Sequence, residues 1–162
     1  LDAARRALLA FEGIGRRCQI HRDIDVGGKQ VTVVDDYGHH PKELDAVLKT
    51  IRRTFPGKRL VVVFQPHRYT RTRDLLDDFA TVLSRADVLV LLEVYAAGEA
   101  PIAGADGRAL ARAIRSRGHI DPVFVAELAQ VTEVLADLVQ ADDVVALLGA
   151  GNIGGIAEAL VA

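Results

Sequence analysis

The stretch that decides the fold is residues 31–41, VTVVDDYGHHP. It opens with three valines and a threonine, and β-branched residues of this kind favour a strand. Pro41 with Glu43 favours the first turn of a helix, because a proline at the first helical position loses no needed N–H group. Two carboxylates, a phenol and two imidazoles lie between the two elements. In open α/β sheets ligands bind at this place, so we expect a site here.

A plainer interpretation of the same stretch stays open. Asp35 and Asp36 could simply end the strand, while His39 and His40 cap the helix that follows. The binding interpretation is favoured because similar chemistry recurs after later strands of the chain.

The rest of the chain alternates between predicted strands and helices. Residues 16–25 and 30–36 predict a β-hairpin that turns at the Gly27-Gly28 pair. Continuous apolar runs predict further strands at 60–64, 88–92, 122–125 and 143–148, and helical spacing predicts helices at 42–55, 74–84, 107–117, 128–139 and 156–161. This order predicts a Rossmann-like α/β fold, which is a mostly parallel sheet flanked by helices on both faces, with an N-terminal β-hairpin.

The first residues suggest a domain boundary. Residues 1–11 carry apolar side chains at helical spacing, and Gly13 and Gly15 then interrupt the pattern. The chain begins without a methionine, so we interpret residues 1–15 as the tail of a preceding domain with a hinge, and residues 16–162 as a separate domain. An ordinary N-terminal helix is the alternative.

Composition narrows the class of protein. The formal net charge of -2 gives no sign of broad attraction to nucleic acid or to an anionic membrane. The single cysteine, Cys18, excludes an internal disulfide and fits a reducing compartment. No apolar run reaches the roughly 18 residues that a membrane-spanning helix needs. We therefore expect neither a nucleic-acid partner nor a membrane partner.

Polar or glycine-rich loops follow four of the predicted strands. They are residues 35–40 (DDYGHH), 65–72 (QPHRYTRT), 93–99 (EVYAAGE) and 149–154 (GAGNIG). Because the carboxyl ends of parallel strands share one edge of a sheet, these loops should converge on a single binding crevice.

Of the four loops, the one at 65–72 carries the side chains best suited to binding or catalysis. His67, Arg68 and Arg71 place positive charge on one turn, and arginine suits bidentate binding of a carboxylate or phosphate. We predict an anion site there, with Thr70 or Thr72 as a helix cap. The alternative is a surface turn whose arginines pair with the aspartates at 74, 77 and 78.

Other motifs leave alternatives open. GAGNIG matches the GxGxxG pattern of dinucleotide sites, but it follows the last strand, so a tight turn with close helix–strand packing is the better interpretation. Arg16 and Arg17 are either a solvated basic pair, or one of them crosses the hinge and contacts a phosphate. Glu93 and Glu99 could bind a metal or an ammonium group, but isolated loop glutamates are usually solvated. No metal site is predicted.

Four motifs, in this order and spacing, carry a resemblance. DDYGHHPKE, FQPHRYTRT, LLEVYAAGEAPI and GAGNIG resemble the carboxyl-terminal part of the UDP-N-acetylmuramate:L-alanine ligases, within the Mur ligase family, from Gly13 onward. The amino-terminal UDP-binding domain and any GxxGK[ST] phosphate loop are missing from this sequence. The resemblance implies a cytoplasmic enzyme of peptidoglycan precursor synthesis. It would use ATP and Mg2+ to convert UDP-N-acetylmuramate into an acyl phosphate, which the amino group of L-alanine attacks.

The resemblance also implies roles for particular residues. Arg17 would approach the ATP phosphates and Asp36 the ATP ribose. His39 and His67 are implied as catalytic residues; Tyr37 would shape the reaction pocket with His39, and His67 would also hold the muramoyl or acyl-phosphate end.

Two arginines complete the implied site. Arg68 and Arg71 would bind the carboxylate of L-alanine. The main Mg2+ ligands and the phosphate loop belong to the missing domains, so this chain would close over them as a lid and is not expected to be active alone.

Two other classes of protein remain open from the sequence. One is a freestanding dinucleotide-binding module, which GAGNIG suggests. The other is a non-catalytic α/β domain that binds a partner protein.

Overall fold

The computed structural model describes residues 15–162. The helix predicted over residues 1–11, the break at Gly13 and most of the proposed 1–15 segment lie outside the described residues, so the predicted domain boundary stays a prediction.

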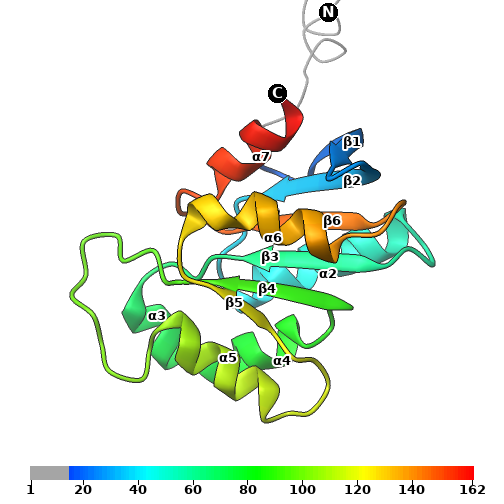
Figure 1. The fold of residues 1–162 in the computed structure, drawn as a ribbon. Helices are drawn as coiled ribbons and strands as arrows, with labels where there is room; N and C mark the ends of the chain where they lie inside the picture. The colour runs from blue at the N-terminus through cyan, green and yellow to red at the C-terminus, as the bar shows by residue number, and fades with distance from the viewer. Residues whose placement is uncertain (1–14) are drawn as a thin grey trace, which may run out of the picture.

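One six-stranded sheet forms the centre of the molecule (Figure 1). Its strands, in spatial order, are β1 (Gln19–Val26), β2 (Lys29–Asp36), β6 (Val144–Leu148), β3 (Leu60–Phe64), β4 (Val88–Leu92) and β5 (Val123–Val125). β1 pairs antiparallel with β2, and all other neighbours pair in parallel. The hairpin turns at Gly27 and Gly28, whose φ angles of 60° and 81° favour glycine. The predicted fold class is confirmed.

The helices follow the strands in the predicted order, but several bounds differ: the helix predicted over 128–139 begins with a 3-10 turn, and the helix predicted over 156–161 begins two residues earlier. They are α2 (Pro41–Thr54), α3 (Tyr69–Asp74), α4 (Leu76–Leu83), α5 (Gly107–Arg115), the 3-10 turn η1 (Leu128–Gln130), α6 (Val131–Leu138) and α7 (Gly154–Val161). The single helix predicted over 74–84 was wrong in its start. Helical structure begins five residues earlier, at Tyr69, and is interrupted at Leu75, because the polar segment before Asp74 is fixed by contacts with another loop rather than by an apolar stripe.

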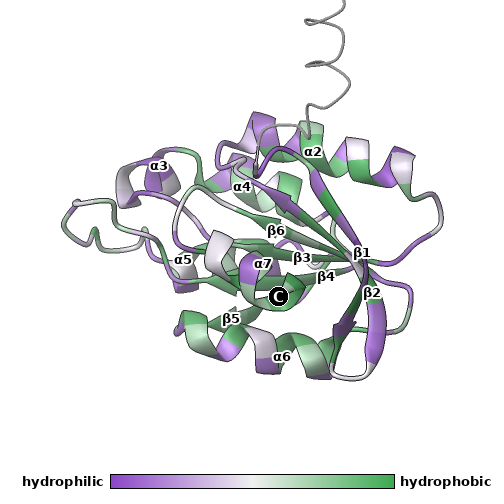
Figure 2. Ribbon diagram, turned by 90° about the horizontal axis from the view of Figure 1, so that it is seen from above, coloured by the Kyte–Doolittle hydropathy of each residue, from purple (hydrophilic) through white to green (hydrophobic). Residues whose placement is uncertain are grey.

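Two apolar cores lie on opposite faces of the sheet, because successive strand residues point to opposite sides. Val62 and Phe64 of β3 face the core shared with α2, α4 and α5. Val61 and Val63 face the other core, which α6 and α7 cover. Figure 2 shows these helices on either side of the sheet. Among residues 15–162, every helix is too short or too polar to cross a lipid bilayer.

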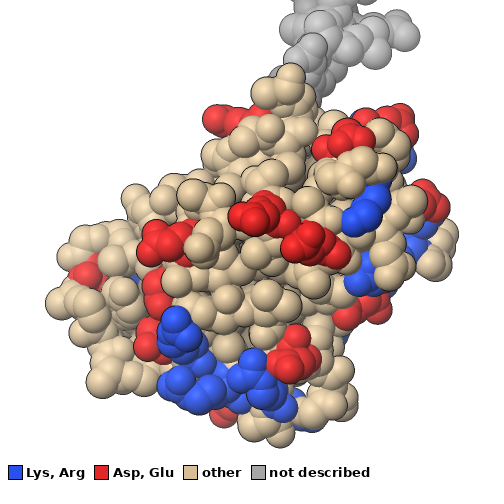
Figure 3. Space-filling model, in the orientation of Figure 1, with Lys and Arg blue, Asp and Glu red and all other residues tan. Residues whose placement is uncertain are grey.

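The face drawn in Figure 3 carries both signs of charge. Basic side chains gather over α5, whose last turn holds Arg112 and Arg115, and acidic side chains lie over the region of α6. This face therefore offers no extended surface of one sign.

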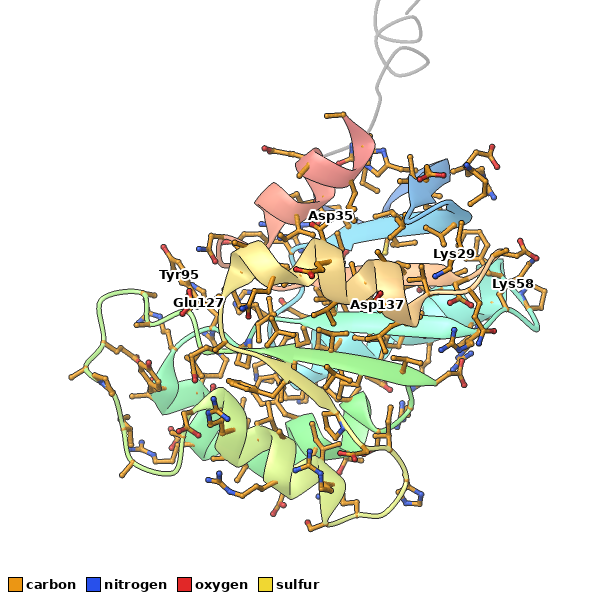
Figure 4. The ribbon with its side chains drawn as sticks, in the orientation of Figure 1. Lys29, Asp35, Lys58, Tyr95, Glu127 and Asp137 are labelled. Carbon is orange, nitrogen blue, oxygen red and sulfur yellow. The ribbon has the colours of Figure 1, made fainter. Side chains whose placement is uncertain are left out.

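The carboxyl ends of the parallel strands lie at one edge of the sheet. Asp36 of β2 pairs with Leu148 of β6, Leu148 pairs with Phe64 of β3, and Phe64 pairs with Leu91 of β4. The four loops that follow these residues therefore begin side by side, as predicted. Figure 4 shows Tyr95 and Glu127 near this end of the sheet and Lys58 at the opposite end.

Candidate functional site

Four aromatic rings form a row along the carboxyl edge of the sheet. The ring centroids of Tyr37 and His39, of His39 and His67, and of His67 and Tyr95 are each 5.5 Å apart. The row joins the loop after β2 to the loops after β3 and β4. The structure thus brings together the Tyr37 loop and the Arg68 loop, which the sequence analysis required.

The two histidines of the loop after β2 have different roles. His40 is the N-cap of α2, and its Nδ1 accepts a hydrogen bond from the Lys42 N–H at 3.3 Å. Glu43 completes a capping box by accepting the N–H groups of His39 and His40. The capping interpretation is therefore correct for His40. The His39 ring instead lies against His67 in the ring row.

Asp36 is buried and its carboxylate already has partners. Its side-chain oxygens accept the N–H groups of Cys18 at 2.8 Å and of Gly38 at 2.7 Å, and the residue is only 4% exposed. These contacts bind the end of β2 to the start of β1 and to its own turn. The contact with an ATP ribose stays a prediction.

His67 is held by its neighbours in one tautomer. A guanidinium nitrogen of Arg71 lies 3.3 Å from His67 Nδ1 and donates at 3.1 Å to the His67 carbonyl oxygen. Arginine has only donors, so the contact with Nδ1 requires that nitrogen to be an acceptor and places the ring proton on Nε2. Burial, followed by the nearby His39, Arg71 and Arg68, lowers the pKa of His67. The lowered pKa favours the neutral imidazole, in which the contact with Arg71 leaves Nε2–H as the donor.

Arg68 and Arg71 remain available for an anion. Arg68 is half exposed, and its guanidinium approaches the Glu99 carboxylate only to 3.9 Å. Among the described residues Arg71 makes no ion pair, and Asp74 and Asp77 pair with other arginines of the chain. The alternative of a surface turn that uses these aspartates is not what the structure shows.

The cap predicted for the helix in this loop was wrong. Arg68 itself is the N-cap of α3, with a φ of 74° and no capping side chain. Thr70 instead donates its N–H and its hydroxyl to Glu99, at 3.0 and 2.6 Å, and the Thr72 hydroxyl donates to the Arg68 carbonyl oxygen. Glu99 thus ties the loop after β4 to α3.

The two glutamates of the loop after β4 both bind protein groups. Glu93 accepts the N–H groups of Val94 and Gly107, each at 2.8 Å. Within residues 15–162 no three His, Cys, Asp or Glu side chains are grouped to hold a metal ion. Tyr95, in the same loop, was not predicted as a site residue. It lies three residues after the end of a buried strand, in a polar loop like that of Tyr37, and this position is the signal that could have found it.

A cavity of about 260 Å³ opens beside the ring row. Its polar lining comes from the ends of β3, β4, β5 and β6 and includes Gln65, Glu93, Tyr95, Glu127 and Asn152. The loops after β3, β4 and β6 thus share a polar cavity, but the loop after β2 and the predicted site residues His67, Arg68 and Arg71 do not line it, so the single crevice predicted for all four loops is present only in part.

The glycines of GAGNIG are packed against protein atoms. A Cβ at Gly149 would come within 2.8 Å of the Gln65 carbonyl oxygen, and one at Gly151 would come within 2.8 Å of the Tyr95 side chain. A Cβ at Gly154 would lie 2.8 Å from the guanidinium of Arg16. The interpretation as a tight turn with close packing is confirmed.

Arg16 and Arg17 have different environments although they are neighbours in sequence. The Arg16 side chain is 24% exposed and pairs with Asp35, while Arg17 is exposed and lies near the Tyr37 ring, 5.7 Å from its centroid. Arg17 thus lies at the rim beside Tyr37, and its contact with phosphate stays a prediction.

Comparison with known protein families gives one match over most of the chain. Residues 16–151 match the model of the Mur ligase, glutamate ligase domain. The match begins at Arg16 and ends inside the glycine loop, so it includes three loops of the rim and the first half of the fourth.

Individual relatives and a solved structure agree with this match. The chain is 60% identical over 156 residues to a UDP-N-acetylmuramate--L-alanine ligase of Methylococcus capsulatus, covering 96% of this chain and 33% of the relative. It is 58% identical to the enzyme of that name from Halorhodospira halophila, covering 95% of this chain and 32% of the relative. The crystal structure of a UDP-N-acetylmuramate-alanine ligase from Thermotoga maritima superposes with a TM-score of 0.74 at 30% identity, over 96% of this chain and 31% of that one. The chain thus spans about a third of the length of the curated relatives that it matches.

Proposed function

The chain belongs to the Mur ligase family, and from that premise we propose that it is the carboxyl-terminal domain of a UDP-N-acetylmuramate:L-alanine ligase. Such an enzyme would act in the cytoplasm in peptidoglycan precursor synthesis. The observation that carries the proposal is the rim itself. Arg71, which makes no ion pair among the described residues, and Arg68, which lies 3.9 Å from the Glu99 carboxylate, flank His67 within a domain 60% identical to a ligase of that name.

The arginine side of the rim suits the carboxylate of an amino acid. Arg71 is fixed at two points by His67, and the half-exposed Arg68 begins the same helix. Two guanidiniums that grip a carboxylate leave the amino group free to point at an acyl carbon, and such orientation lowers the entropic part of the barrier. We therefore assign the carboxylate of L-alanine to Arg68 and Arg71.

The ring row suits the reacting centre. His67, neutral and protonated on Nε2, can donate a hydrogen bond to an oxygen of the acyl group without carrying charge itself. The adjacent guanidiniums offset negative charge that accumulates as the tetrahedral intermediate forms. His39 and Tyr37 wall the site on the β2 side. In this proposal His67 orients and polarises, and it does not exchange protons.

Of the two residues assigned to ATP, Arg17 fits a nucleotide contact better than Asp36 does. ATP with Mg2+, when bound, supplies the phosphoryl group that activates the muramoyl carboxylate. Arg17 is exposed and positively charged beside Tyr37, which fits a phosphate contact. Asp36 offers the ribose little exposed surface, because its oxygens already accept two N–H groups. The main Mg2+ and phosphate ligands are expected in the domains that precede this one.

The test uses the complete enzyme that carries this domain. Arg68→Ala and Arg71→Ala should each raise the KM for L-alanine at least tenfold, since a charged hydrogen bond contributes about 1.5–3 kcal/mol. The KM for ATP should change little. Arg73→Ala is the matched control, because Arg73 is an exposed arginine of the same helix that pairs with Asp74. An unchanged KM for L-alanine in both variants would refute the proposal.

A further inference from the structure

Arg16, in the turn before β1, contacts three separate parts of the molecule through its side chain. Arg16 Nε lies 3.2 and 3.3 Å from the two side-chain oxygens of Asp35, and Nη2 donates at 2.6 Å to the Gly149 carbonyl oxygen. Its guanidinium carbon is 5.3 Å from the centroid of the Tyr37 ring. One guanidinium thereby joins the end of β2, the glycine loop after β6 and the first ring of the row.

The backbone of Arg16 makes a further link to the site. Its carbonyl oxygen accepts the Tyr37 N–H at 2.8 Å, and its own N–H donates to the Gln19 side chain at 3.2 Å. Arg16 and Cys18 both have left-handed backbone angles, with φ of 57° and 47°. Because such angles are unfavourable for residues other than glycine, tertiary contacts must hold this turn.

A positive charge alone at this position would not reproduce the contacts of Arg16. Asp35 is 4% exposed, and burial raises its pKa while the Arg16 guanidinium acts in the opposite direction. The planar guanidinium reaches a carboxylate and a carbonyl at once, whereas an ammonium group is a single point of charge. A Cβ at Gly154 would collide with this guanidinium, so the first turn of α7 is shaped around it. Figure 4 shows Asp35 at the end of β2 beneath α7.

We propose that Arg16 is a positioning residue, which fixes the turn beside Tyr37 and thereby directs the neighbouring Arg17 toward the nucleotide. The inference rests on the proposed function, in which Arg17 contacts a phosphate of ATP. Arg16 turns inward and is held at Asp35, Gly149 and Tyr37, so the chain must present the next side chain, Arg17, outward over the Tyr37 ring. Arg16 itself touches no substrate.

The experiment measures steady-state kinetics of the complete enzyme with Arg16 replaced. Arg16→Ala should raise the KM for ATP at least tenfold and leave the KM for L-alanine within twofold, because Arg68 and Arg71 lie on another loop. Arg16→Lys, which keeps the charge, should recover less than half of the loss on a logarithmic scale. Arg22→Ala is the matched control, because Arg22 also lies over an aromatic ring, that of Phe55, but near the other end of α2.

A role in stability alone would give a different result. It would lower the amount of folded enzyme, so the apparent kcat would fall while both KM values stayed at wild type, and that outcome would overturn the inference. If Arg16→Ala does not fold, Arg16→Lys and Asp35→Asn decide in the same assay. A raised KM for ATP in either supports the inference, and unchanged values in both overturn it.

Arg17→Ala separates this inference from the proposed function. If Arg17→Ala raises the KM for ATP and the Arg16 variants do not, only the positioning role is wrong. If neither Arg17→Ala nor the Arg16 variants affect ATP, the nucleotide assignment of the proposed function fails as well, and the positioning role falls with it.

Discussion

A methyl group added at Gly151 should destabilise the protein before any ligand is considered. The new Cβ would lie 2.8 Å from the Cβ and Cγ atoms of Tyr95 and would also press on the side-chain oxygen of Gln65. Gln65 cannot step aside freely, because its amide donates to Asn152 at 2.7 Å and accepts the Ile153 N–H at 3.1 Å. Tyr95 is equally constrained, since its backbone exchanges hydrogen bonds with the loop after β3 at 2.8 and 2.9 Å.

The magnitude follows from these contacts. Overpacking typically costs about 1–3 kcal/mol, and the lower entropy of the unfolded alanine chain returns about 0.4–1 kcal/mol. Gly151→Ala should therefore lose about 1–2 kcal/mol, or a Tm about 2–8 °C below wild type for a chain of this size. The assay is urea unfolding and scanning calorimetry of the chain without nucleotide.

Gly155→Ala is the matched control. Gly155 lies in α7, no atom is within 4 Å of a Cβ built there, and alanine favours a helix, so this variant should gain about 0.5–1 kcal/mol. A Gly151→Ala chain at least as stable as wild type would refute the packing argument. It would mean that the glycines serve a ligand rather than the fold, and the dinucleotide alternative would regain support.

The remaining predictions concern titration and activity. Burial lowers the pKa of His67 most, and the charge of Arg71 lowers it further, so Arg71→Ala should bring that pKa closer to its ordinary value in an NMR titration; a pKa that stays or falls would contradict the geometry. The folded state disfavours the charged imidazole of His67. Its contribution to the free energy of unfolding is therefore fully present above the ordinary histidine pKa and is lost as the pH falls through the lowered pKa. Burial and the nearby Asp36 raise the pKa of Cys18 to about 11, so at pH 8 its reaction with a disulfide reagent should be about 100-fold slower than that of a free thiol, and a free-thiol rate would be evidence against this environment. The 162-residue chain alone should release no phosphate from ATP with UDP-N-acetylmuramate and L-alanine present, and any release that depends on L-alanine would contradict this prediction.

Much of the fold is readable from local patterns. The strand at Leu60–Phe64 was predicted residue for residue because a strand buried on both faces is apolar throughout. The helix after Pro41 was predicted because its proline, its glutamate and its apolar stripe all agree. The convergence of the loops then followed from the parallel order of strands.

The start of the helix at Tyr69 was missed for a physical reason. Its first turn has no capping side chain of its own, and the residue that accepts its free N–H, Glu99, is 29 positions away in sequence. No window of local sequence contains that partner.

The sequence by itself determined the α/β architecture, the common edge of the loops and the family to which the chain belongs, because each depends on periodicity or on motifs that are local. Only the tertiary structure decided which of two adjacent identical residues does which work. His40 caps a helix while His39 enters the ring row, and Arg16 turns inward while Arg17 stays exposed. The physical reason is that neighbours of one type have the same local preferences. Distant groups such as His67, Asp35 and Gly149 select between them, and only the folded sheet brings those groups into reach.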